Sequence, residues 1–204
     1  MGLFRKSPLQ NSETAGYLEG HVLVAMPSMP DPNMAQATIF LCAHAPGGAM
    51  GLMLNKLVGN ISFADLLRQL RIMPAGKRIH GVPVQFGGPV QTGRGFVLHS
   101  NEYDAGASTT KVGQSLGLRL GLTETVDVVK AIADGRGPKE SMLALGYAGW
   151  GAGELESQIQ RHAWLTCPPD DFLLFGHSYQ DKWEHAIRKL GIDPSKLSRD
   201  AGRA

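Results

Sequence analysis

GHVLVAMPSMPDPNMAQATIFLCAHAPGGAMGLMLNK, residues 20–56, carries three apolar runs, and each run stops at a strong turn signal. Short apolar runs bounded by proline, glycine or asparagine are typical of buried β-strands. We therefore predict three core strands in close succession, at residues 22–26, 38–43 and 49–54.

Outside this stretch, further apolar runs alternate with segments of helical periodicity. Ser62, followed three residues later by Asp65, forms a capping-box pattern, and Leu66, Leu67 and Leu70 supply a buried face behind it. Residues 100–111 show no pattern and are expected to form an irregular loop. Strands are also expected at residues 82–86, 95–99, 116–122, 142–145 and 163–166, and helices at 123–135, 154–161 and 181–190.

Strands and helices mix without a strict βαβα order, and neither a linker nor a repeat divides the chain. We predict an α/β (mixed α+β) single domain in which helices pack on a mixed β-sheet, in a three-layer-like arrangement. The domain is expected to cover residues 17–192. Residues 1–16 are expected to form a flexible N-terminal arm, and residues 193–204 a polar C-terminal tail.

Charge and cysteine content narrow the class of protein. The net charge of +2 and the pI near 8.6 fall short of the strongly basic balance, above roughly pI 9, that nucleic-acid binding usually shows. Only two cysteines are present, which favours a reducing compartment. Because the sequence shows neither a signal-peptide pattern nor an apolar stretch of about 20 residues, we expect a cytoplasmic protein without a membrane partner.

The sequence lacks the common cofactor motifs. The glycines at 47–51 run into an apolar strand instead of the Lys-Ser or Lys-Thr of a phosphate-binding loop, and Gly93-Arg94-Gly95 does not continue as GxGxxG. The seven histidines show no paired ligand spacing such as HxxxH. We therefore predict no metal site and no cofactor.

Two catalytic hypotheses can be formed. Cys42 and His44 are two residues apart in a predicted strand, and alternate residues of a strand share a face, so they could form a nucleophile and its base. Burial in a core strand is the simpler explanation of Cys42. Glu154 is a second candidate, as an acid/base group.

Polar and glycine-rich signals gather at the predicted strand ends, where loops commonly form pockets. Trp150, between glycines, could stack on a planar ligand, or it could fill the core. Turn capping is the alternative role for the polar side chains in this group. The predicted ligand-binding residues are Asp31, Asn55, Gly87, Gly88, Pro89, His99, Trp150 and Glu154.

Three blocks resemble the YqgE/AlgH family of bacterial proteins. They are residues 20–56, residues 87–99 with Gly87-Gly88-Pro89-Val90 and Phe96-Val97-Leu98-His99, and residues 146–165 with Gly146-Tyr147-Ala148-Gly149-Trp150. The resemblance covers most of residues 17–180. It implies a single-domain α/β fold with a mixed sheet and no established activity, although some members are named as regulators of alginate gene expression. Glu154 stands where that family more usually has Gln.

Three functions follow from these observations. The first is a cytoplasmic protein that binds a small ligand or a protein partner and has a regulatory role, which includes transcriptional regulation. The second is an enzyme of unknown reaction that uses Cys42 with His44, or Glu154. The third is direct DNA binding through the mildly basic C-terminal end. Its basic residues are Lys182, Arg188, Lys189, Lys196, Arg199 and Arg203, and they slightly outnumber its acidic residues, which are Asp181, Glu184, Asp193 and Asp200.

Overall fold

The computed structural model describes residues 17–75 and 82–197. The predicted arm at residues 1–16 and the last residues of the predicted tail, 198–204, lie outside the described residues. In chain order the strands and α-helices are β1 (Val22–Ala25), β2 (Thr38–Ala45), β3 (Gly48–Met53), α1 (Phe63–Gln69), β4 (Val84–Phe86), β5 (Val90–Ser100), β6 (Thr109–Val112), β7 (Leu120–Thr123), α2 (Val126–Ala133), β8 (Ser141–Gly151), α3 (Glu154–Gln160), β9 (Trp164–Cys167), α4 (Asp171–Phe175) and α5 (Lys182–Lys189). Short 3₁₀ turns are η1 (Pro32–Met34), η2 (Gly106–Ser108), η3 (Gln114–Leu116), η4 (Tyr179–Asp181) and η5 (Pro194–Lys196).

The strands form one nine-stranded sheet in the order β6-β7-β5-β8-β3-β2-β1-β9, and β4 pairs with β8 beside this path. Only the β4–β8 pairing is parallel among the described strands, and the others are antiparallel. The long central strand β8 joins both halves, since its first part pairs with β5 and its last part with β3. The predicted mixed sheet in a single domain is confirmed.

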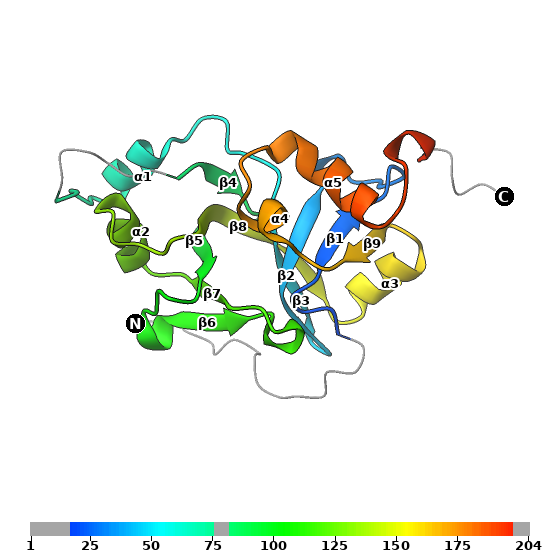
Figure 1. Ribbon diagram of the computed structural model, residues 1–204, viewed down its shortest axis with the longest axis horizontal. Coiled ribbons are helices and arrows are strands. Elements are labelled where there is room, and N and C mark those ends of the chain that lie inside the picture. The colour runs from blue at the N-terminus through cyan, green and yellow to red at the C-terminus, as the bar shows by residue number, and fades with distance from the viewer. Residues whose placement is uncertain (1–16, 76–81, 198–204) are drawn as a thin grey trace.

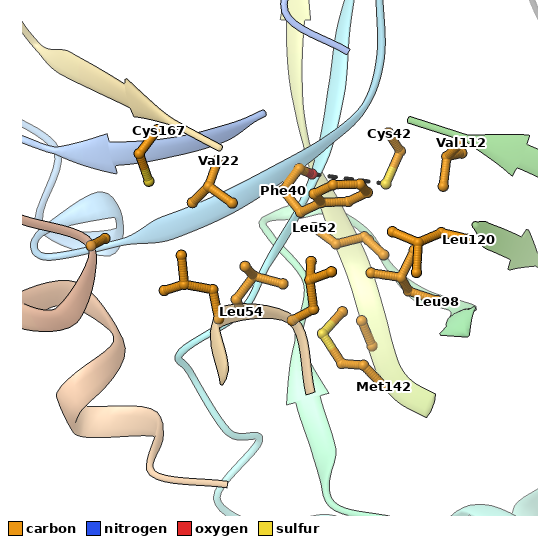
Figure 2. Close-up of a cluster of buried hydrophobic side chains, with 14 of the residues drawn as sticks. Val22, Phe40, Cys42, Leu52, Leu54, Leu98, Val112, Leu120, Met142 and Cys167 are labelled. Carbon is orange, nitrogen blue, oxygen red and sulfur yellow. Dashed lines mark hydrogen bonds between the residues drawn. The ribbon is translucent and has the colours of Figure 1, made fainter. Parts of the chain in front are cut away.

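Helices cover both faces of the sheet, which confirms the layered arrangement (Figure 1). On one face, α4 and α5 pack on the largest apolar cluster, and Figure 2 shows its side chains from β1, β2, β3 and β5 pointing toward one another. On the other face, α3 covers one half of the sheet, and α1 with α2 covers the other half. Alternation along β1 shows the division, because Val22 and Val24 point to the α5 face while Leu23 and Ala25 point to the α3 face.

Local signals place most helix starts correctly. Ser62 and Asp65 form the predicted capping box, since each side chain accepts from the other residue's backbone N–H. The predicted buried face of α1 is only partly right: Leu66 and Leu67 are buried, but Leu70 is 38% exposed. The reason is that the helix ends at Gln69, earlier than the proline stop indicated, and Phe63 takes the core position instead.

The edge of the sheet around β6 differs most from expectation. Residues 109–112 form β6 inside the segment expected to be an irregular loop, and the predicted strand at 116–122 begins only at Leu120. β6 alternates weakly, with only Val112 buried, because it is an edge strand that pairs with β7 alone. Edge strands carry little apolar periodicity, so the sequence pattern gives no sign of β6.

Candidate functional site

Asn55 and Asp31 hold loops together at one end of the sheet. Directly after β3, the Oδ1 of Asn55 accepts from the N–H of Thr38 at 3.0 Å, and its Nδ2 donates to the carbonyl of Gln36 at 2.8 Å. Asp31 caps η1 by accepting from the N–H of Asn33 at 2.8 Å. Both side chains thus serve the backbone around them, as the turn-capping alternative describes.

The segment 87–89 makes a close backbone crossing over β8. Gly88 has a φ of +149°, and a Cβ there would overlap the backbone of Tyr147. A Cβ at Gly87 would overlap the carbonyl oxygen of Gly146. Both glycines are buried, while Pro89 is exposed in the turn before β5. Glycine is required here because two backbone segments of the chain lie too close together for any side chain to fit between them.

Trp150 belongs to a buried pair of tryptophans. Its indole N–H donates to Oε1 of Gln158 at 3.0 Å, and the indole N–H of Trp164 donates to the same oxygen at 2.8 Å. The rings meet edge to face with centroids 6.0 Å apart, an arrangement that aromatic quadrupoles favour. Glu154 is exposed beside them and accepts from the N–H of Gly151 at 2.9 Å. Trp150 is 7% exposed and takes a core position.

His99 lies in the other half of the sheet and is fully buried. Its Nδ1 lies 2.8 Å from the carbonyl oxygen of Ser100, so this nitrogen must be the one that carries the hydrogen. Its Nε2 then accepts from the hydroxyl of Thr123 at 2.9 Å. Both ring nitrogens are therefore occupied inside the protein.

The eight predicted residues lie in separate parts of the sheet. The N–H of Met53 donates to the carbonyl of Gly87 at 2.9 Å, which places the glycine crossing near the Asn55 end of β3. Trp150 pairs with Ala49, at the opposite end of β3. Neither of the two surface cavities described below has any of the eight in its lining.

The prediction that Cys42 and His44 share a sheet face is wrong. The β2–β3 register shifts between Leu41 and Ala43, so Cys42 is the extra residue of a β-bulge, and a bulge interrupts the two-residue alternation. Cys42 points into the cluster under α4 and α5 (Figure 2), where its Sγ approaches the carbonyl of Phe40 at 3.8 Å. Burial raises the pKa of the Cys42 thiol, so this residue lacks the activated thiolate that nucleophilic catalysis requires.

His44 instead reaches α3 on the opposite face. Its Nε2 lies 3.0 Å from Oε1 of Glu156, and its Nδ1 accepts from the backbone N–H of Leu18 at 3.0 Å. In the described residues no three His, Cys, Asp or Glu side chains stand together in a group that could hold a metal ion.

The larger cavity, about 570 Å³, opens beneath α4, where β5 ends and where β7 and β8 begin. We call it the strand-end cavity. Its floor is apolar, and its rim carries polar groups together with positively and negatively charged side chains. The lining consists of Ser100, Leu118, Arg119, Leu120, Glu140, Asp171, Phe172, Leu174, Phe175, Gly176 and His177.

The sheet register places Arg119 and Glu140 on opposite sides of Ser100 in this cavity. Ser100 pairs with Leu120 on one side, and on the other side its N–H donates to the carbonyl of Glu140 at 3.1 Å. Arg119 directly precedes Leu120, so the guanidinium and the carboxylate arise from strands on either side of Ser100. Since neighbouring strands are about 4.8 Å apart, the two backbones are separated by about 10 Å.

A smaller cavity, about 370 Å³, lies beside α5. It is lined mainly by polar groups and by the indole of Trp183, whose N–H donates to the carbonyl of Ala25 at 2.8 Å. The lining consists of Pro27, Gln36, Trp183, Glu184, Arg188, Asp193, Pro194, Ser195 and Leu197.

The charged residues of the strand-end cavity were not singled out in the sequence. Arg119 fell inside the predicted strand 116–122, and Glu140 fell in a loop between a helix and a strand. One signal was available, because each charged residue directly precedes an apolar strand, at Leu120 and at Ser141. Only the pairing order brings those two strand starts to the same end of the sheet.

Part of the basic C-terminal end is engaged within the protein. Lys182 is fully buried in α5, Arg188 pairs with Glu184 at 3.2 Å, and Lys189 pairs with Asp170 at 2.8 Å. Arg199 and Arg203 lie outside the described residues. In the described part of the chain, no helix has the length and apolar character needed to cross a membrane.

The fold therefore defines a single-domain mixed α+β protein built on one curled, mainly antiparallel sheet. A family model described as AlgH-like matches residues 22–195. A UPF0301 protein of Bradyrhizobium sp. (strain BTAi1) is 49% identical over 195 residues, covering 93% of this chain and 88% of that protein. A UPF0301 protein of Rhodospirillum rubrum is 49% identical over 189 residues, covering 93% and 95%.

Solved structures agree with this match. The solution structure of the AlgH protein from Pseudomonas aeruginosa is 42% identical, covers 96% of this chain and 99% of that chain, and has a TM-score of 0.74. A crystal structure of a protein from Corynebacterium diphtheriae has a TM-score of 0.65 at 18% identity, which shows a shared fold. This chain belongs to the AlgH-like family, and the resemblance seen in its sequence is confirmed.

Proposed function

We propose that this protein binds a small molecule in the strand-end cavity and acts as a ligand-responsive regulatory protein of the cytoplasm. The observation that carries the proposal is the cavity's lining, in which an apolar floor lies beneath charged groups of both signs. Binding sites for small molecules characteristically combine apolar walls with a few polar groups that fix orientation. A volume of about 570 Å³ lies within the usual range for such sites.

The lining also indicates the chemistry of the ligand. Phe172, Phe175 and the neighbouring leucines offer an apolar and aromatic surface. Arg119 offers a cation on the β7 side, and Glu140 offers a carboxylate on the β8 side. A compact zwitterion with an apolar body, such as an apolar amino acid or a short peptide, places an anion near Arg119 and a cation near Glu140.

Neither rival function gains a comparable observation. The Cys42 thiol is buried and separated from His44 by the sheet, and Glu154 accepts hydrogen bonds that fix the turn before α3. Lys182, Arg188 and Lys189 are buried or paired, which reduces the basic surface that direct DNA binding would use.

A thermal-shift and NMR titration with the free amino acids and a dipeptide set tests the proposal. An apolar member of the set is expected to stabilise the wild type and to shift resonances at Ser100 and Phe175. Arg119→Met and Glu140→Gln should each remove the effect without unfolding the protein, because both side chains are exposed. Arg161→Met, a change at the exposed residue that follows α3, is the matched control. Undiminished binding by both cavity variants, or no binding by any compound of this class, would overturn the assignment.

A further inference from the structure

His44 joins the start of the described chain to α3 through both of its ring nitrogens. Only 1% of its side chain is exposed. Nε2 lies 3.0 Å from Oε1 of Glu156, and Nδ1 lies 3.0 Å from the backbone nitrogen of Leu18. The ring of Tyr17 packs edge-on against the imidazole, with centroids 5.1 Å apart.

The partners determine which nitrogen carries the hydrogen. A backbone N–H only donates, so Nδ1 must be the unprotonated acceptor for Leu18. Nε2 then carries the single hydrogen and donates it to the carboxylate of Glu156. The contact with Leu18 therefore exists only while His44 is neutral.

We propose that His44 is a proton-controlled latch, whose hydrogen bond from the backbone N–H of Leu18 forms when the imidazole is neutral and is lost when it takes up a second proton. The added hydrogen goes to Nδ1, where it points at the hydrogen of the Leu18 N–H, because the two nitrogens are only 3.0 Å apart. Two donors cannot share that position, so the bond to Leu18 is lost. The bond from Nε2 to Glu156 remains and becomes an ion pair.

The carboxylate of Glu156 stays beside the imidazole once the latch opens. From α3 the facing group is Glu156, whose pKa is held below its ordinary value by its own backbone N–H and, to a lesser degree, by His44, so it stays ionised. On β3 the cross-strand neighbour of His44 is Ala49, which carries no charge. Tyr17 belongs to the released segment itself.

Release is confined to the first residues because later ones have independent anchors. The carboxylate of Glu19 accepts from the N–H of Gly113 at 2.9 Å, and the N–H of Gly20 donates to the carbonyl of Leu41 at 2.8 Å. Neither bond involves His44. Leu18 itself keeps two other contacts, since its carbonyl accepts from the N–H of His21 at 3.0 Å and its side chain packs on the cluster under α3. The latch therefore frees the Leu18 amide while the sheet beyond it stays paired.

NMR on the labelled full chain tests this proposal between pH 8 and pH 5. The ring nitrogens of His44 report its proton uptake, and hydrogen exchange of the Leu18 amide reports release. The protection of that amide is expected to fall about tenfold with the same midpoint as the imidazole, since one hydrogen bond is lost. The amide of Gly20 should keep its protection.

Two variants separate the latch from a general effect of pH. In His44→Gln, a side-chain oxygen accepts from Leu18 but does not titrate, so protection becomes independent of pH. In Glu156→Gln, release moves to lower pH because the imidazolium loses its counter-ion. His162→Asn, at an exposed histidine with a φ of +57° that Asn tolerates, is the control that should behave as wild type. If the wild-type His44 titrates while Leu18 keeps its protection, or if His44 stays neutral down to pH 5, the latch does not exist.

Discussion

Lys182 provides the sharpest prediction, because the structure buries its amine without a counter-charge. It begins α5 and is 0% exposed, and Nζ has no hydrogen-bond partner among the described residues. The one favourable contact seen is with the ring of Tyr179, whose centroid lies 5.2 Å from Nζ. Burial lowers the pKa of Lys182 from 10.5 to about 8.

The sign of the pH dependence follows from proton binding in the two states. Below pH 8 both the folded and the unfolded chain hold the proton, so the full cost of burying the charge is present. Between pH 8 and pH 10.5 the folded state releases its proton while the unfolded state keeps it, and the free energy of unfolding rises with pH. Because the pKa falls from 10.5 to about 8, and each pKa unit corresponds to about 1.36 kcal/mol, this cost is about 3 kcal/mol.

Replacing Lys182 with Met keeps the apolar stem and removes the amine. We expect Lys182→Met to be more stable than the wild type by up to about 3 kcal/mol at pH 7, and the difference to vanish near pH 10.5. Urea unfolding followed by fluorescence of the buried tryptophans, from pH 6.5 to pH 10.5, measures this difference. Lys130→Met, an exposed lysine on α2, is the matched control and should show no such trend.

Parallel stability curves for the wild type and Lys182→Met across this pH range would refute the reasoning, because they would mean that the amine is solvated or paired in solution. A loss of stability in Lys182→Met at pH 7 would refute it as well.

Two further predictions concern the cap of α4 and the close backbone crossing at Gly88. Asp170→Asn should cost about 1–2 kcal/mol. The asparagine oxygen can still cap α4 by accepting from the N–H of Leu173, but the negative charge that binds His185 and Lys189 of α5 is lost. Those partners hold the pKa of Asp170 at about 2, so the wild type should lose this stability as pH falls from about 4 to 2. Urea unfolding at several pH values measures the loss. If the stability of Asp170→Asn fell with pH in the same way as that of the wild type, the assignment would be wrong. Gly88→Ala should prevent stable folding, since its Cβ overlaps the backbone of Tyr147, whereas Gly93→Ala, with open space around it, should keep a wild-type melting temperature; equal melting temperatures for the two would exclude the close crossing.

The sequence alone determined the elements whose signals are local. The apolar runs at 22–26, 38–43 and 49–54 became β1, β2 and β3, because burial on both faces demands apolar residues throughout a strand. Ser62 marks the start of α1 correctly, since a cap depends only on residues three positions away. The family followed from the same level of information, as ordered blocks of residues.

Tertiary structure alone decided which side chains meet. One extra residue in β2 sent Cys42 and His44 to opposite faces, and no local pattern marks a bulge that forms against a partner strand. The strand-end cavity depends on β7, β5 and β8 lying side by side, although Arg119 and Glu140 come from different connections. The burial of Lys182 was likewise decided by tertiary packing, because helix periodicity does not show how much of α5 is buried against the sheet. Contacts between distant segments depend on strand order and packing, and local patterns in the amino-acid sequence do not specify either of these.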